Sequence, residues 1–302
     1  MDLESLQRRF AVPGTLTFEQ VNGLTLLKVT TPLAHAAMYL QGAHLTDWQP
    51  VGQEGVIFMS RKSELAPGVP IRGGVPIAFP WFATDSNKQR IDGHPGPSHG
   101  FARVQEWTLE SAGFAGKDFV LKLTLGPTAM SRSMGYDRFL LTLKVAVGAR
   151  LSMELTVANV GQEALSFEEA FHTYFKVVDV HEVKLTGLEP TPYVDKTDGM
   201  KVKPATGAPV TFTGATDRVY LDTEAACTIH DGTQRRDIRL VKKNSHTTVV
   251  FNPWKAMPDL AEWDWHEMLC VETVNAARNA RTLAPGEEFT MGSLISVERW
   301  TG

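Results

Sequence analysis

The sequence lacks several features that mark specialised classes of protein. Its two cysteines, Cys227 and Cys270, are too few for a disulfide framework in 302 residues, and they show no CxxC spacing for a structural zinc ion. With 30 basic and 34 acidic residues, the net charge of −4 gives no basic excess for nucleic-acid binding. No apolar run approaches the roughly 20 residues of a membrane span, and the N-terminal residues lack the apolar region of a signal peptide. We therefore expect a cytoplasmic protein that binds neither nucleic acid nor a membrane.

What the chain does have is enough apolar sequence for a large core, at 43% hydrophobic residues. The dominant pattern has a period of two, because apolar residues alternate along Phe119–Leu125, Phe139–Val147 and Leu151–Val157. Each segment is typical of a strand with one buried face, and Gly148-Ala149-Arg150 between the last two predicts a hairpin. Weaker strand patterns occur at Leu24–Val29, Val56–Met59, Trp107–Ser111, Ile238–Val241, Thr247–Phe251, Met268–Thr273 and Met291–Val297.

Helical patterns are few. Residues 2–10 predict one short helix and Ala256–His266 another, and no alternation of strands and helices indicates a parallel α/β fold. Residues 187–216, rich in Gly, Pro and Thr, are interpreted as long loops with short strands rather than as a linker. The sequence therefore predicts an all-β protein, with residues 1–302 forming one antiparallel β-sandwich domain.

The block from Arg72 to Arg103 is the most informative segment. Proline and glycine at its density exclude a helix interior or a central strand, so it predicts an ordered loop system that positions polar side chains. Guanidinium groups match phosphate oxygens in a bidentate manner, although each arginine alone is also compatible with a surface ion pair. His99 and Arg103 share a face if their segment is extended. The block contains Arg72-Gly73-Gly74-Val75-Pro76, Phe79-Pro80-Trp81-Phe82 and Pro97-Ser98-His99-Gly100-Phe101-Ala102-Arg103.

His172 is a candidate acid or base. If residues 167–175 form a strand, their phenylalanines share the face that enters the core. His172 then points to the opposite face with Glu168 and Tyr174, where it can line a cleft. The same pattern also allows a half-buried histidine that is satisfied by a neighbour, and the segment Glu168-Glu169-Ala170 tolerates a helix.

Glu272 is the second candidate. It lies in an apolar strand with Cys270 on its own face, and a carboxylate in such surroundings is rarely buried without a partner. Desolvation would raise its pKa above the reference of roughly 4.3, which suits a general base near neutral pH. The alternative is a glutamate at a strand edge in water. Asp217, in a polar loop that leads into a strand, is a weaker candidate for binding sugar hydroxyls, because such a residue also caps turns.

Several other site types are not indicated. The nine histidines form no HExxH or other tight ligand spacing, so we expect no metal and no other cofactor. No Gly-x-Ser-x-Gly elbow indicates a serine hydrolase. A histidine and a glutamate without a nucleophile favour proton transfer, and cations in the loops favour a neutral polar ligand with an anionic tail.

Together these segments resemble the aldose 1-epimerase superfamily, and within it the hexose-6-phosphate mutarotases. The resemblance spans about residues 20–298 in the family order. It is carried by Ile71-Arg72-Gly73-Gly74-Val75-Pro76, Phe79-Pro80-Trp81-Phe82, His99-Gly100-Phe101-Ala102-Arg103, Ala170-Phe171-His172-Thr173-Tyr174-Phe175, Thr216-Asp217-Arg218-Val219-Tyr220, Phe251-Asn252-Pro253-Trp254 and Val271-Glu272.

The resemblance implies a galactose mutarotase-like β-supersandwich and an isomerase that acts on a sugar phosphate, with D-glucose 6-phosphate expected, as a monomer. It also implies roles for six residues: His172 as general acid, Glu272 as general base, Arg72 and Arg103 as phosphate ligands, Asp217 as a ligand of sugar hydroxyls, and His99 as a lining residue. A reference histidine pKa of roughly 6.5 means that His172 needs help to stay charged, for which Glu168 and Glu272 are candidates.

Two departures from the resemblance concern the loops. Several relatives carry Gln before the His-Gly pair, where this chain has the shorter Ser98. The stretch Asp85–Pro95, with Lys88 and Arg90, is individual and bears on substrate preference.

Three other functions remain open. A mutarotase for unphosphorylated sugars would not require Arg72 and Arg103, and a non-catalytic carbohydrate-binding domain would not require a paired acid and base. A glycoside hydrolase needs two facing carboxylates, of which only Glu272 is evident.

Overall fold

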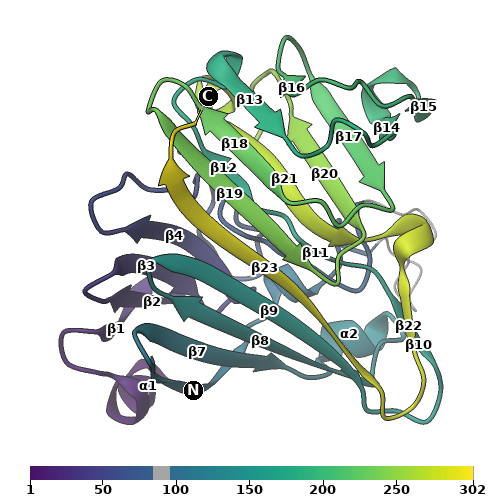
Figure 1. Ribbon diagram of the computed structural model, residues 1–302. Helices are drawn as coiled ribbons and strands as arrows, with labels where there is room; N and C mark the ends of the chain where they lie inside the picture. Colours follow the sequence, from purple (N-terminus) through teal and green to yellow (C-terminus); the bar gives the residue numbers. More distant parts are fainter. Residues whose placement is uncertain (84–95, 302) are drawn as a thin grey trace.

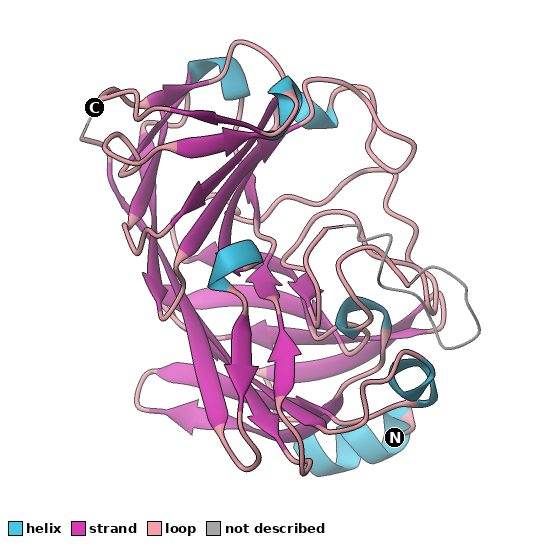
Figure 2. Cartoon of the chain, turned by 90° about the vertical axis from the view of Figure 1, so that its right-hand side faces the viewer, coloured by secondary structure: helices cyan, strands magenta, loops and turns pink. Residues whose placement is uncertain are grey.

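The computed structural model describes residues 1–83 and 96–301, and its regular secondary structure is mostly antiparallel strands (Figures 1 and 2). The described α-helices are α1 (Leu3–Phe10) and α2 (Ala129–Ser133). Short 3-10 turns occur at Ala102–Val104, Val180–Glu182, Lys196–Asp198, Asp264–His266 and Ala277–Asn279.

A nine-stranded sheet forms one layer of the described structure, and β23 crosses it along its length (Figure 1). Alternating burial along β7, β8 and β9 confirms the period-two prediction, and β8 and β9 form the predicted hairpin. In order across the sheet, its strands are β16 (Val210–Thr211), β13 (Val183–Thr186), β18 (Cys227–Asp231), β19 (Arg236–Lys243), β23 (Glu288–Arg299), β9 (Arg150–Asn159), β8 (Phe139–Val147), β7 (Asp118–Leu125) and β6 (Thr108–Ala115).

An eight-stranded sheet carries the candidate site. In order its strands are β15 (Lys201–Lys203), β14 (Tyr193–Asp195), β17 (Thr216–Leu221), β20 (Thr247–Asn252), β21 (Met268–Asn275), β11 (Glu169–Phe171) and β5 (Ile77–Ala78), while β12 (Tyr174–Lys176) also pairs with β21. Every residue of β21 is buried, because both faces of this strand are covered. Leu269 and Val271 join the main core together with residues of the nine-stranded sheet, whereas Cys270 belongs to a separate cluster on the opposite face.

Two smaller sheets complete the described fold. A four-stranded meander contains β1 (Leu16–Val21), β2 (Leu24–Thr30), β3 (Ala34–Tyr39) and β4 (His44–Pro50), and a two-stranded sheet pairs β10 (Leu165–Phe167) with β22 (Arg281–Leu283). The segment Val56–Met59, predicted as a strand, makes only isolated bridges, one of them between Met59 and Gly73.

One helix prediction is confirmed and the other is wrong. In α1, the Asp2 carboxylate accepts a hydrogen bond from Ser5 N at 2.8 Å, and Leu6 and Phe10 are buried. Between Ala256 and His266 only the 3-10 turn Asp264–His266 forms. The buried Asp264 carboxylate accepts hydrogen bonds from the backbone of Arg61 and Ala261, so it stabilises a looped path instead of a helix.

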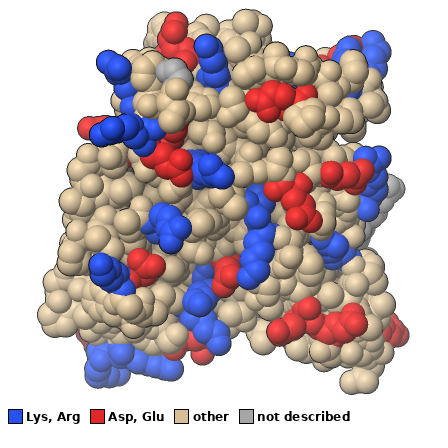
Figure 3. All heavy atoms as spheres, viewed as in Figure 1, with Lys and Arg blue, Asp and Glu red and all other residues tan. Residues whose placement is uncertain are grey.

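Acidic and basic side chains are interspersed on the face seen in Figure 3. Within the described residues no helix is long and apolar enough to cross a membrane. The predictions of a single domain, a monomer and a cytoplasmic location, and of no nucleic-acid or membrane partner, stay predictions.

Close backbone packing fixes the loop that carries His99. Gly100 has φ +74°, and its backbone lies so near Phe79 that an added Cβ would lie 2.0 Å from the Phe79 carbonyl oxygen. Gly100 N donates to Pro97 O at 3.1 Å, and residues 102–104 turn into the 3-10 segment. The segment is therefore bent at Gly100 and not extended, so the condition under which His99 and Arg103 would share a face is not met.

We expect Gly100→Ala to lower the free energy of unfolding by more than about 2 kcal/mol, because it combines a left-handed φ with a backbone clash. Gly113→Ala is the matched control, since an added Cβ there meets nothing within 4 Å. Urea unfolding of both variants measures the difference. Equal midpoints would show that the loop adapts without cost.

Candidate active site

Strand register explains how distant parts of the sequence meet at one site. In β17, β20 and β21, alternate residues face the same side of the eight-stranded sheet. Two rows of side chains therefore cross this face, one through Val219, Val249 and Glu272 and the other through Asp217, Phe251 and Cys270.

His172 extends the first of these rows. Phe171 is paired with Thr273 and Tyr174 with Cys270, so the same register across the gap between β11 and β12 sets His172 opposite Glu272. On its other side, His172 N donates to Pro76 O at 3.0 Å, which brings the Gly-rich segment alongside. The predicted alternation of residues 167–175 is thus confirmed, although the strand is interrupted at His172.

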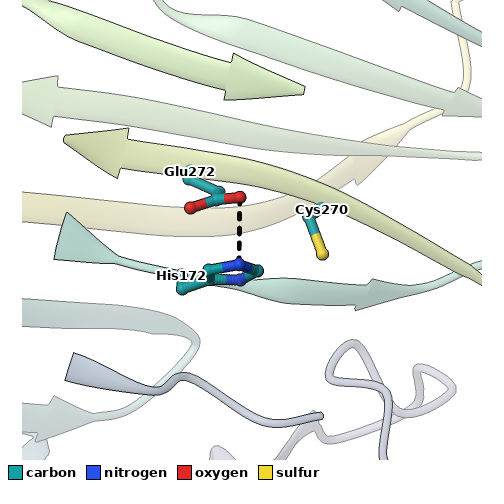
Figure 4. A group of neighbouring side chains, drawn as sticks. All are labelled: His172, Cys270 and Glu272. Carbon is teal, nitrogen blue, oxygen red and sulfur yellow. Dashed lines mark ion pairs between the residues drawn. The ribbon is translucent and has the colours of Figure 1, made fainter. Parts of the chain in front are cut away.

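The two side chains form a buried pair with His172 Nε2 3.3 Å from Glu272 Oε1 (Figure 4). The side chain of His172 is 12% exposed and that of Glu272 1%. Burial, and then the charge of Asp217, hold the pKa of Glu272 well above its usual value. Burial, and then neighbouring His99, Arg103 and Arg72, hold the pKa of His172 well below its usual value. Both shifts favour the uncharged form of the side chain, the neutral imidazole of His172 and the neutral carboxyl group of Glu272.

The proposed helpers do not keep His172 charged. Glu168 instead accepts hydrogen bonds from the backbone of Phe82 and of Ala277, both at 2.8 Å, so its carboxylate stabilises two loops. Glu168 and Glu272 were candidates for keeping His172 charged, but in the free protein burial is the largest influence on His172 and holds its pKa below the usual value.

His99 lies edge-on to His172, with ring centroids 5.1 Å apart. Its Nδ1 accepts a hydrogen bond from Ala83 N at 3.2 Å, so the proton of the neutral ring is on Nε2. Burial, followed by the charge of Arg103, lowers the pKa of His99 to about 3. His99 is therefore a neutral hydrogen-bond donor at physiological pH.

Arg72 is held in place by two neighbours. Its Nε donates to Asp259 Oδ2 at 2.8 Å, and its Nη1 donates to Tyr174 Oη at 2.9 Å. Its Nη2 lies 2.7 Å from the same Asp259 oxygen in an ion pair. Although burial opposes its charge, Tyr174 and Asp259 raise the pKa of Arg72. Of the five N–H groups of a guanidinium, at least one on each terminal nitrogen remains for a ligand. Tyr174 also stacks on His172 with centroids 4.9 Å apart, so it links the cation to the pair.

Arg103 differs from Arg72 because no carboxylate pairs with it among the described residues. Burial, followed by the opposing charge of Arg72, lowers its pKa to about 10, and its buried Nε has no hydrogen-bond partner. Arg103 is absent from the residues that line the cleft, but it lies near enough to lower the pKa of His44, His99 and His172.

Asp217 lies at the far side of the site, where its Oδ2 is 3.0 Å from Lys196 Nζ. The cleft that joins these groups has a volume of about 410 Å³. It brings together five of the six predicted site residues, all but Arg103. Its lining is Arg72, Phe82, Ala83, Ser98, His99, His172, Lys196, Asp217, Val249, Phe251, Met257 and Glu272.

The sequence did not reveal Lys196, Asp259 or the contact of Tyr174 with Arg72. Asp259 lies within the segment wrongly predicted as helix, and Lys196 lies in a region interpreted only as loops. For Tyr174 the sequence did give a signal, because the alternation of residues 167–175 placed it on the same face as His172. Asp85–Pro95, including Lys88 and Arg90, lies outside the described residues.

The same face offers one group of metal-ligating atoms in the described part of the chain. The donor atoms of His172, Cys270 and Glu272 lie within 4.8 Å of one another. Burial, followed by Glu272, holds the pKa of the Cys270 thiol well above its usual value, so the thiol is protonated in the metal-free protein.

Buried neutral histidines should make the protein sensitive to acid. Burial lowers the pKa of His44 to about 4, below the value of about 6.5 in an unfolded chain. The unfolded state then binds more protons, so the stability present above pH 6.5 is lost as the pH falls to about 4, on the order of 3 kcal/mol for this group.

His44→Gln should flatten this loss, because glutamine can still donate to Gly73 O, which accepts from His44 Nε2 at 2.8 Å, but does not titrate. The exposed His35→Gln is the control. Urea unfolding from pH 7.5 to 4 measures the slopes, and parallel curves for His44→Gln and wild type would refute a buried neutral His44.

Comparison with known proteins agrees with this geometry. A family model described as aldose 1-epimerase matches residues 25–296. A protein from Salmonella typhimurium is 36% identical over 281 residues, covering 90% of this chain and 92% of its own length. Another from Escherichia coli K12 is 30% identical over 286 residues, covering 91% and 94%. Both carry the name "Putative glucose-6-phosphate 1-epimerase".

Solved structures show the same relationship. One from Salmonella typhimurium, described as a "putative mutarotase", has a TM-score of 0.87 at 32% identity and covers 96% of each chain. A galactose mutarotase-like protein from Lactobacillus casei, at 15% identity and a TM-score of 0.72, shares the fold over 90% of this chain and 100% of its own. The predicted all-β supersandwich is confirmed, and the chain belongs to the aldose 1-epimerase family of isomerases.

Proposed function

We propose that the protein interconverts the α and β anomers of a hexose 6-phosphate, with D-glucose 6-phosphate as the expected substrate. The observation that carries the proposal is the His172–Glu272 pair, 3.3 Å apart, at a cleft that also contains Arg72. The names of the two relatives from Salmonella typhimurium and Escherichia coli support the choice of a sugar phosphate.

Anomer exchange needs a proton acceptor at one oxygen of the sugar and a proton donor at another. When the C1 hydroxyl loses its proton and the ring oxygen O5 gains one, the C1–O5 bond breaks and an aldehyde forms. Rotation about C1–C2 and closure on the other face of the carbonyl invert C1. A pair of side chains that exchanges one proton can act as both the acceptor and the donor. Its starting protonation state is restored when the ring closes.

Substrate phosphate would set which member of the pair holds that proton. In the free protein, Arg72 and Arg103 help to lower the pKa of His172. A bound phosphate would offset their positive charge, so the pKa of His172 would rise and the proton could move from Glu272 to His172. His172 then acts as the acid toward O5, and Glu272 acts as the base toward the C1 hydroxyl, which are the roles that the family resemblance implies.

The remaining residues suit the two ends of such a substrate. Arg72 keeps two N–H groups for phosphate oxygens while Asp259 and Tyr174 fix its plane. Arg103 supplies a second cation with an unpaired Nε. At the other side, Asp217 and Lys196 offer an acceptor and a donor to sugar hydroxyls, and His99 offers its Nε2–H.

One observation favours a second candidate, a mutarotase for unphosphorylated aldoses. Arg72 already has an ion pair with Asp259, so its charge is balanced without a phosphate. In that case the arginines would stabilise the loops and Arg103 would remain a structural cation.

We expect His172→Ala and Glu272→Gln each to reduce kcat for glucose 6-phosphate by about 10²–10⁴, the range for loss of a general acid or base. Exchange NMR measures the interconversion of the anomers, and circular dichroism checks folding. Cys227→Ala, a change in the opposite sheet, is the control and should retain the wild-type rate. A folded His172→Ala or Glu272→Gln variant with a near-wild-type rate would remove that residue from the mechanism.

Arg72→Ala and Arg103→Ala separate the two candidate substrates. Loss of a charge-assisted hydrogen bond, worth roughly 1.5–3 kcal/mol, should lower kcat/KM for glucose 6-phosphate by about 10–150-fold and leave free glucose unaffected. Arg278→Ala, which removes an exposed ion pair with Asp222, is the control. Equal losses for both sugars would contradict phosphate binding and favour the unphosphorylated aldose.

A further inference from the structure

We propose that His172, Cys270 and Glu272 form a binding site for a thiophilic divalent cation such as Zn²⁺, and that the cation inhibits the enzyme by occupying the acid–base pair. The binding step stands on the geometry of these three side chains alone. The inhibition rests on the proposed function of His172 and Glu272.

The spacing of the donor atoms fits a tetrahedral ion. Two ligands at zinc distances of about 2.0–2.1 Å, separated by a tetrahedral angle, lie about 3.3 Å apart. His172 Nε2 and Glu272 Oε1 are already 3.3 Å apart. All three donor atoms lie within 4.8 Å of one another, so the Cys270 sulfur has to approach by roughly 1 Å on binding.

The fold presents the three groups on one side. Cys270 and Glu272 are two residues apart on β21, so they share a face, and His172 approaches from the segment between β11 and β12 (Figure 4). Glu272 Oε2 is buried without a hydrogen-bond partner, which leaves acceptor capacity at the site. Because His172 and Glu272 line the cleft, a water molecule can complete four-fold coordination from that side.

Charge and protons balance on binding. A Zn²⁺ ion takes the imidazole lone pair, the carboxylate and the thiolate, and the protons that these groups carry beforehand pass to the solvent. The resulting site is neutral overall, which suits its burial. Nitrogen with thiolate sulfur selects zinc or cobalt over magnesium or calcium.

Occupation of the site would stop proton transfer, because the metal takes the electron pairs that His172 and Glu272 need. Cys270 is the residue that distinguishes this site from the acid–base pair alone. Cys227 is an equally buried, free cysteine on β18 of the opposite sheet, so it is a matched control.

The test uses the full chain without an affinity tag, in a buffer that does not chelate metals. Titration calorimetry with Zn²⁺ should show one ion bound per chain, and Co²⁺ should give a thiolate-to-cobalt absorption band. Cys270→Ser and Cys270→Ala should abolish the band and weaken zinc binding by more than the about 10–100-fold that loss of an outer-shell partner costs. Cys227→Ser should bind as the wild type does.

Exchange NMR then measures inhibition, each variant being compared with its own metal-free rate. Zn²⁺ should inhibit the wild type and Cys227→Ser at the same concentration, and Cys270→Ser only at a concentration at least about tenfold higher. Absence of a cobalt–thiolate band in the wild type, or zinc affinity unchanged in Cys270→Ser, would overturn the site. A cobalt–thiolate band in a protein that converts neither sugar would support the metal site while contradicting the proposed function.

Discussion

The site depends on one physical constraint, which is that two titratable groups are buried side by side in a sheet. Register sets His172 opposite Glu272, and burial disfavours the charged form of each. A single shared proton satisfies both conditions. The pair can therefore take a proton at one sugar oxygen and return it at another without net change, which is the requirement for anomer exchange.

The loops around the pair act on it through charge and packing. Arg72 and Arg103 lower the pKa of His172, and Tyr174 contacts both Arg72 and the His172 ring. The same arginines are the groups that a phosphate would bind. Under the proposed function, phosphate binding to these arginines would therefore change the pKa of His172 through electrostatics over short distances.

Alternation along the chain was enough to predict the long strands of the two large sheets, the Glu272–Cys270 face and the direction of His172. It did not predict β1, β3 and β4, and the predicted strand Val56–Met59 makes only isolated bridges. It did not predict the loop around Asp259, because the buried carboxylate of Asp264 organises that segment through contacts with residues about 200 positions away in sequence. Periodicity also gave no sign of the low pKa of His172, which follows from its burial and then from the neighbouring His99, Arg103 and Arg72. The local sequence pattern therefore predicted the side chains on the sheet face of the site. The pKa shifts at the site depend on long-range packing.

The central claim is that the buried pair catalyses anomer exchange of a sugar phosphate. Two-dimensional exchange NMR on glucose 6-phosphate, with and without the wild-type protein, tests it most directly. If the pair catalyses the exchange, cross-peaks between the α and β anomers should grow faster with protein than without it. The increase in rate should be proportional to the protein concentration. An exchange rate equal to the spontaneous rate at every protein concentration would contradict it.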